Sequence, residues 1–228
     1  MHYGYFDPTI VILLPAIIIS AIAQFKVSSA FNKYKHISSR SGYTGEQVAR
    51  MMLDNAGLYN IPIQVVNKQL GDHYDPRSRV LRLSPEVYYE RSIAAAGVAA
   101  HEVGHAIQHS QGYSPLNIRN SIFPIVNFSS SFSWILFLIG LIMSSKPLLT
   151  IGILMFTAVV VFQLITLPVE FNASSRALKI LENRGILYND EVKGAKKVLT
   201  AAAMTYVAAA LMSILQLIRL IALSKRND

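Results

Sequence analysis

The sequence predicts a mainly α-helical, multi-pass membrane protein with a small α+β module on the cytoplasmic side. One reason is its apolar content, since 52% of the 228 residues are hydrophobic. A second is the distribution of that content, because four long stretches contain no Asp, Glu, Lys or Arg. Each has about the 20 residues that a helix needs to cross a bilayer. The stretches are 8–25, 120–145, 147–169 and 198–218.

The four stretches differ in detail. The second is the most polar, with Pro124, Asn127 and three consecutive serines, so its membrane-crossing part is expected to begin near Phe132. Residues 1–7 contain no Lys or Arg and lack the basic segment of a cleaved signal peptide, so the first span should be retained. The chain has no cysteine, which excludes disulfides and thiolate metal sites.

The charge distribution predicts the topology. A net charge of +8 is compatible with nucleic-acid binding, but 17 of the 21 Lys and Arg residues follow the first and third stretches, which must share one side. The positive-inside rule makes that side cytoplasmic and both termini external. We therefore expect a bilayer and no nucleic acid as partner. Segment 26–40 either lies against the anionic leaflet or is a solvated helix end. Arg219, Lys225 and Arg226 leave open whether the last helix crosses fully.

Between the first two spans, the pattern predicts a small α+β unit. Residues 44–47, Thr-Gly-Glu-Gln, match a capping box that begins a helix reaching about Asn55. Residues 61–66 and 80–83 are predicted strands, and 71–78 are predicted as a turn. The strands should form a hairpin or a small sheet.

Two further helices should follow. Ser84-Pro85-Glu86 favours a helix start, because proline suits the first helical position. The next helix should run from about Ser92 to Ser110 and stop near Gly112.

This last helix carries the motif His-Glu-x-x-His. His101 and His105 project from one helical face, one turn apart, and can bind one zinc ion. Zinc acidifies a water molecule and polarises a carbonyl, while Glu102 can take and return the proton. A chance match is the alternative. However, the preceding run 92–100 is uncharged and rich in alanine, and a buried helix would leave the polar motif unpaired without a ligand.

A catalytic zinc generally has three protein ligands. His109 continues the same face, but at ~1.5 Å rise per residue it lies ~12 Å from His101 along the axis, too far to share one ion. We expect it to be an exposed or supporting histidine. Glu170 is a candidate because it follows the third span beside Pro168, on a helical face with small residues that permits close packing. From spacing alone, it could equally be a glutamate at the membrane boundary that faces water.

Longer stretches of the chain resemble a known family. Asp-His-Tyr-Asp-Pro-Arg at 72–77, Val-Leu-Arg-Leu-Ser at 80–84, residues 99–108 and Gly-Tyr at 112–113 are similar to the YugP-type neutral zinc metallopeptidases, a bacterial membrane family. The resemblance covers nearly the whole chain and implies a zinc-dependent endopeptidase.

The segment that begins at Glu170 is also similar to the Glu-x-x-Ala-Asp element of membrane gluzincins. In that element the glutamate is the third zinc ligand, so the resemblance implies this role for Glu170. Ala173 matches the alanine, whereas Ser174 replaces the aspartate.

The sequence thus predicts a membrane-bound zinc metallopeptidase that cleaves a protein or peptide, membrane-associated or not, at the cytoplasmic face. The predicted zinc ligands are His101, His105 and Glu170, with Glu102 as general base. Candidates for stabilising the transition state are His73, Tyr74, Arg176 and Tyr206.

Other functions stay open. One is an intramembrane zinc protease, disfavoured because only nine uncharged residues precede His101. Another is a non-catalytic scaffold with structural zinc, disfavoured because such a site has no use for Glu102 beside an open coordination position.

The predicted organisation follows the spans. The first transmembrane helix ends at residue 25, and a zincin-like cytoplasmic module with the His-Glu-x-x-His helix follows. The later part of the chain supplies the third ligand, so a metal would clamp it onto that helix. The predicted segments are 1–25 for the first span, 26–119 for the module, 120–167 for a transmembrane helical pair, 168–197 for a cytoplasmic helix with the third ligand, and 198–228 for the last span and tail.

Overall fold

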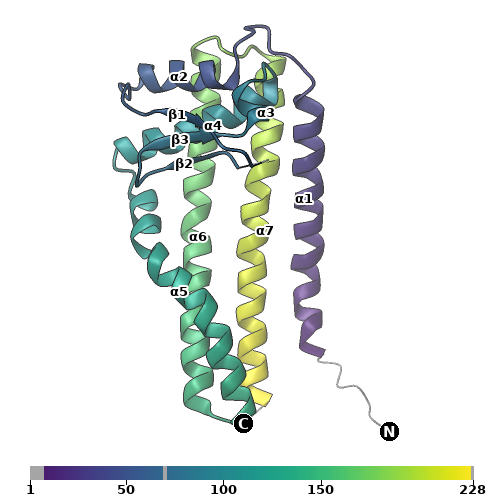
Figure 1. Ribbon diagram of the computed structural model, residues 1–228. Helices are drawn as coiled ribbons and strands as arrows, with labels where there is room; N and C mark the ends of the chain where they lie inside the picture. The colour runs from purple at the N-terminus through teal and green to yellow at the C-terminus, as the bar shows by residue number, and fades with distance from the viewer. Residues whose placement is uncertain (1–7, 69–70, 227–228) are drawn as a thin grey trace. The chain divides into compact units, whose positions relative to one another are not determined.

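The computed structural model describes residues 8–68 and 71–226, and it is mainly helical with one small sheet (Figure 1). Among the described residues, four helices are long and apolar enough to cross a membrane, which confirms the predicted fold class. They are α1 (Leu14–Tyr34, preceded by a 3₁₀ turn, Pro8–Leu13), α5 (Ser114–Ile142), α6 (Lys146–Asn183) and α7 (Asp190–Arg226). Residues 1–7, from which a retained first span was predicted, lie outside the described residues.

The chain forms two compact units, and each of the four long helices contributes to both. Unit 1 contains the chain up to residue 22, then 118–167 and the chain from 205 onward. Its buried apolar cluster includes Phe137 of α5 and Phe156 of α6. Many other large apolar side chains of this unit are exposed, as expected for helices that face lipid. Ile142, for example, is 83% exposed.

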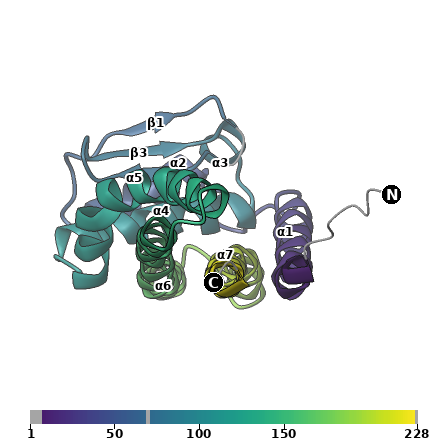
Figure 2. The same cartoon turned by 90° about the horizontal axis from the view of Figure 1, so that it is seen from below.

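Unit 2 contains residues 23–117 and 168–204 and is built around α4. In Figure 2, α4 lies between the sheet and the ends of α6 and α7 that belong to this unit. Its fourteen buried residues explain why the helix is so rich in alanine. The other elements of the unit are α2 (Gly45–Asn55), β1 (Ile63–Val65), β2 (His73–Asp75), β3 (Val80–Leu83) and α3 (Pro85–Tyr88), and α4 itself is Ile93–Ser110.

The sheet has the order β1-β3-β2, with β1 parallel and β2 antiparallel to β3. The small sheet was predicted, but the prediction of one turn over residues 71–78 is wrong, because residues 73–75 form β2. His, Tyr and Asp carry only a weak strand signal, and pairing with β3 supplies what the local sequence lacks. The turn is confined to residues 76–79, where Arg79 has a φ of 52°.

The predicted helix ends are confirmed. Thr44 and Gln47 form the capping box of α2. The Ser92 hydroxyl accepts a hydrogen bond from the Ala95 N–H and caps α4. After α4, Gly112 has a φ of 65°, which suits glycine at a helix C-terminus.

Helix α6 continues through Pro168 to Asn183. Glu170 therefore lies on the same helix as the third apolar stretch. Residues 168–197 comprise the end of α6, a short connection and the start of α7.

Candidate metal centre

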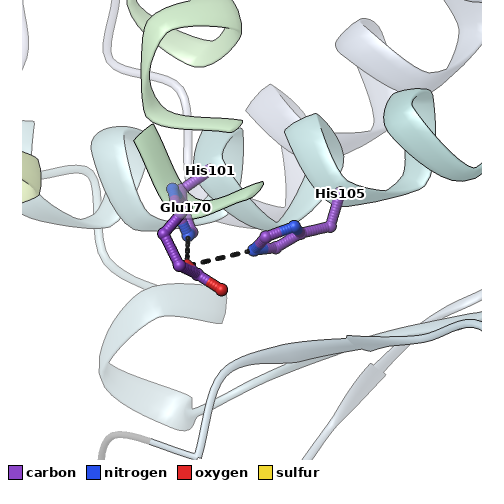
Figure 3. Close-up of side chains that lie close together, drawn as sticks. All are labelled: His101, His105 and Glu170. Carbon is purple, nitrogen blue, oxygen red and sulfur yellow. Dashed lines mark ion pairs between the residues drawn. The ribbon is translucent and has the colours of Figure 1, made fainter. Parts of the chain in front are cut away.

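Three side chains converge between α4 and the unit 2 end of α6. Figure 3 shows His101, His105 and Glu170 pointing toward one another. The Oε2 atom of Glu170 lies 3.3 Å from His101 Nε2 and 3.5 Å from His105 Nε2. All three potential ligand atoms lie within 4.8 Å of one another. This arrangement can hold one metal ion.

Small residues allow the two helices to approach this closely. A Cβ atom on Gly104 would lie 2.7 Å from the carbonyl oxygen of Ala173 on α6, so any larger residue would push the backbones apart. Ala173 and Ala177 are fully buried on the same helix. A carboxylate one turn before Ala173 thereby reaches both histidines.

Gln108 fixes the orientation of His105. This fully buried residue lies one turn after His105, and its Nε2 donates to the carbonyl oxygen of Val169 (2.9 Å) and to Asn172 Oδ1 (3.0 Å). A backbone carbonyl only accepts, so the Oε1 atom of Gln108 must be the group that faces His105 Nδ1, at 3.0 Å. His105 then carries its hydrogen on Nδ1, and its Nε2 lone pair points toward Glu170 and a metal.

His101 has a different partner. The Ser174 hydroxyl lies 3.1 Å from His101 Nδ1 and can accept its hydrogen. Ser174 stands where the resemblance places an aspartate, so a neutral hydroxyl here does the orienting that a carboxylate would do. Both imidazoles therefore present Nε2 to the same point.

Glu102 lies beside this cluster without belonging to it. Its Oε2 accepts a hydrogen bond from the backbone N–H of Tyr74 on β2, at 3.1 Å. Burial raises the pKa of Glu102 to about 7; Glu170 and Asp72 act in the same direction, while His101 opposes them. A nearby metal cation would lower this pKa. A carboxyl group with a pKa near 7 can both take and return a proton near neutral pH.

The four candidate stabilisers have different surroundings. The Tyr74 hydroxyl lies 2.9 Å from His109 Nδ1, and its backbone N–H contacts Glu102. Arg176 donates to Asn172 and Gln111, so it extends the network that begins at Gln108.

The other two candidates are placed differently. The exposed His73 contacts the Gly71 carbonyl oxygen and lies near Arg82, and it projects to the face opposite Tyr74, as neighbouring strand residues do. Tyr206 belongs to unit 1, whereas the cluster belongs to unit 2.

Sequence reasoning missed the role of Gln108. The available signal was its spacing, since a residue three positions after His105 shares its helical face. The contact between Glu102 and the backbone of β2 had no such signal, because that strand was not predicted.

The fold and the site define a membrane protein with a His-His-Glu cluster suited to a metal, next to a buried glutamate. The chain belongs to the family described as "Putative neutral zinc metallopeptidase", whose family model matches residues 9–225. It is 52% identical to the "Putative membrane protease YugP" of Bacillus subtilis (strain 168) over 212 residues, which cover 93% of this chain and 94% of the relative. No solved structure matches it significantly. The resemblance to the YugP-type metallopeptidase family is thus confirmed.

Proposed function

We propose that the protein is a zinc endopeptidase that cleaves protein or peptide substrates at the cytoplasmic face of the membrane. The observation that carries this proposal is the convergence of His101, His105 and Glu170 with Glu102 held alongside. Two imidazole nitrogens and one carboxylate oxygen form the ligand set of catalytic His₂Glu zinc sites. Three protein ligands leave a coordination position open, as a catalytic site requires.

Each residue of the site has its own role in the proposed reaction. Zinc, when bound, would acidify a water molecule and polarise the scissile carbonyl. Glu102 takes the proton of the attacking water and returns it to the leaving amine. The Tyr74 N–H holds the Glu102 carboxylate in place. Tyr74, whose hydroxyl contacts His109, and Arg176, which contacts Gln111, are the proposed candidates for stabilising the developing oxyanion. Because β2 is an edge strand beside Glu102, an extended substrate can add to it by backbone hydrogen bonds.

The two alternative functions fit these observations less well. An intramembrane protease would carry its motif on a spanning helix, but α4 is not among the four candidate spans found in the described residues. A structural zinc site would use a closed set of ligands and would not need a buried carboxyl group of raised pKa beside it. The first observation favours a site outside the bilayer, and the second favours hydrolysis over a structural role.

Metal removal tests this function. Purified full-length protein in detergent should cleave an unfolded test protein such as reduced, alkylated casein. Cleavage should stop after treatment with a zinc chelator, since the nucleophile can no longer be formed, and should return when zinc is added back. Gel electrophoresis follows the fragments. Cleavage that continues at the same rate in zinc-free protein would contradict the proposal.

Single cysteines test whether the site lies on the cytoplasmic side. This side is supported by the 17 of 21 Lys and Arg residues that follow the first and third uncharged stretches. The natural chain has no cysteine, so each introduced thiol is unique. With Ser110→Cys, at the end of the motif helix, a membrane-impermeant maleimide should label only lysed cells. With Ser145→Cys, between α5 and α6, it should label intact cells as well. Labelling of the Ser110→Cys protein in intact cells would reverse the topology.

A further inference from the structure

A groove of about 580 Å³ lies between the end of α1 and the start of α7, two segments that both belong to unit 2. The helices run side by side in Figures 1 and 2. Its lining residues recur at helical spacing on each helix, so one face of α1 and one face of α7 form its walls. Five of them are lysines and define what we term the lysine groove: Lys26, Lys33, Lys193, Lys196 and Lys197.

The groove has one strongly charged end and one mainly apolar end. At the charged end, the Tyr34 ring packs on Gly194, where a Cβ atom would lie 2.7 Å from it, and Lys33 and Lys193 are the neighbours of this pair. Phe25 and Met204 line the other end, more than two helical turns away along each helix, and Lys26 is the one lysine beside them among the described lining residues. Phe25 is 74% exposed, so its ring is available to a ligand.

The groove also marks the boundary between apolar and charged sequence. The uncharged stretch of the first span ends immediately before Lys26, and that of the last span begins immediately after Lys197. Both helices are candidate membrane spans. The apolar end of the groove therefore continues into spanning segments. The lysines of the groove lie where the headgroups of a bilayer are expected.

The positive charge is not balanced within the groove. No acidic residue is among the described residues that line it. The two acidic residues that begin α7 are engaged elsewhere: Asp190 pairs with the Arg40 side chain at 3.0 Å, and Glu191 accepts from the Arg40 N–H. Lys193 and Lys197 repel one another at a spacing of one turn. A bridging anion would relieve this repulsion.

We propose that the lysine groove binds the phosphate headgroup of an anionic phospholipid, with its acyl chains directed along Phe25 and Met204. The charged end supplies donors for phosphate oxygens, and the volume lies within the range of roughly 300–1,000 Å³ typical of small-molecule sites. A soluble phosphate compound would use the lysines alone, whereas a lipid uses both ends. Basic pockets between spanning helices on the cytoplasmic side are a known means of headgroup recognition. The proposal does not depend on hydrolytic activity.

Native mass spectrometry tests the proposal. Full-length protein is extracted in mild detergent with equal amounts of phosphatidylglycerol and phosphatidylcholine, and the retained lipid is counted. The wild type should retain phosphatidylglycerol selectively. Replacing Lys26, Lys193 and Lys197 by Gln should lower this selectivity at least about tenfold, since each lysine near a membrane surface contributes to attracting anionic lipid. Replacing the same three by Arg should keep it.

A matched variant separates the groove from general surface charge. Lys35, Lys68 and Lys179 belong to the same unit but do not line the groove, and replacing them by Gln removes the same charge. This control should bind phosphatidylglycerol like the wild type. Thermal unfolding serves as the folding check, and single Lys26→Gln and Lys197→Gln proteins, each with a partial loss, replace the triple variant if it does not fold. Equal retention of the two lipids by the wild type, or an equal loss in groove and control variants, would overturn the proposal.

Discussion

Purified Glu102→Gln protein should bind zinc like the wild type and hydrolyse substrate at least ~10²–10⁴-fold more slowly, the usual loss for a positioned general base. Gln preserves the side chain's shape and an oxygen acceptor for the Tyr74 N–H, but it cannot take a proton. Zinc should be unaffected because the three clustered ligand atoms come from other residues. Such a protein should also hold its substrate and allow its identification by mass spectrometry.

The matched control is Glu90→Gln, an exposed glutamate just before the same helix, which should cleave like the wild type. Rates are compared at equal zinc content. If Glu102→Gln cleaves as fast as the wild type, Glu102 is not the base. If it loses its zinc, Glu102 is a ligand and the site has been misassigned.

Removing a proposed zinc ligand should strongly lower the zinc content. His101→Ala or His105→Ala should abolish most of the bound zinc measured by elemental analysis, because one of three converging donors is lost. Glu170→Ala should also weaken binding markedly. The residue matched to Glu170 is Glu182, which is exposed on the same helix, and Glu182→Ala should bind zinc normally.

A smaller loss of zinc binding is expected when the residue that holds His105 in place is replaced. Gln108→Leu removes the acceptor that holds His105 and should weaken zinc binding by ~10–100-fold, as is typical when a partner of a ligating histidine is lost. His109→Ala should leave zinc content near wild type, since His109 contacts Tyr74 rather than the cluster. Full zinc occupancy in Glu170→Ala together with loss in His109→Ala would reverse the choice of third ligand. Thermal unfolding distinguishes these losses from misfolding.

Most of the fold could be predicted because its signals are local. The uncharged stretches are continuous in sequence. The capping box at Thr44 and the proline at residue 85 act within a few residues. The strand His73–Asp75 could not be predicted, since it exists through pairing with β3 rather than through its own residues. The continuity of α6 through Pro168 also depends on more than local preference, because proline usually interrupts a helix.

The site was predictable to a different degree. Two histidines and Glu102 follow from the spacing of one motif, whereas Glu170 needed the resemblance to a family as well. The structure brings these residues together, and their roles as ligands and base stay predictions until zinc is measured. Gln108 had a local signal in its spacing from His105, but its bonds to α6 join segments that are distant in sequence, as does the bond from the Tyr74 N–H to Glu102.

The origin of Glu170 on α6 has a consequence for how the protein is made. His101, Glu102 and His105 leave the ribosome together on α4, but Glu170 follows only after α5 and most of α6 have been synthesised. A centre that requires all three ligands is therefore incomplete throughout the early stages of translation. The proposed hydrolysis therefore cannot begin before the second and third apolar helices have been synthesised.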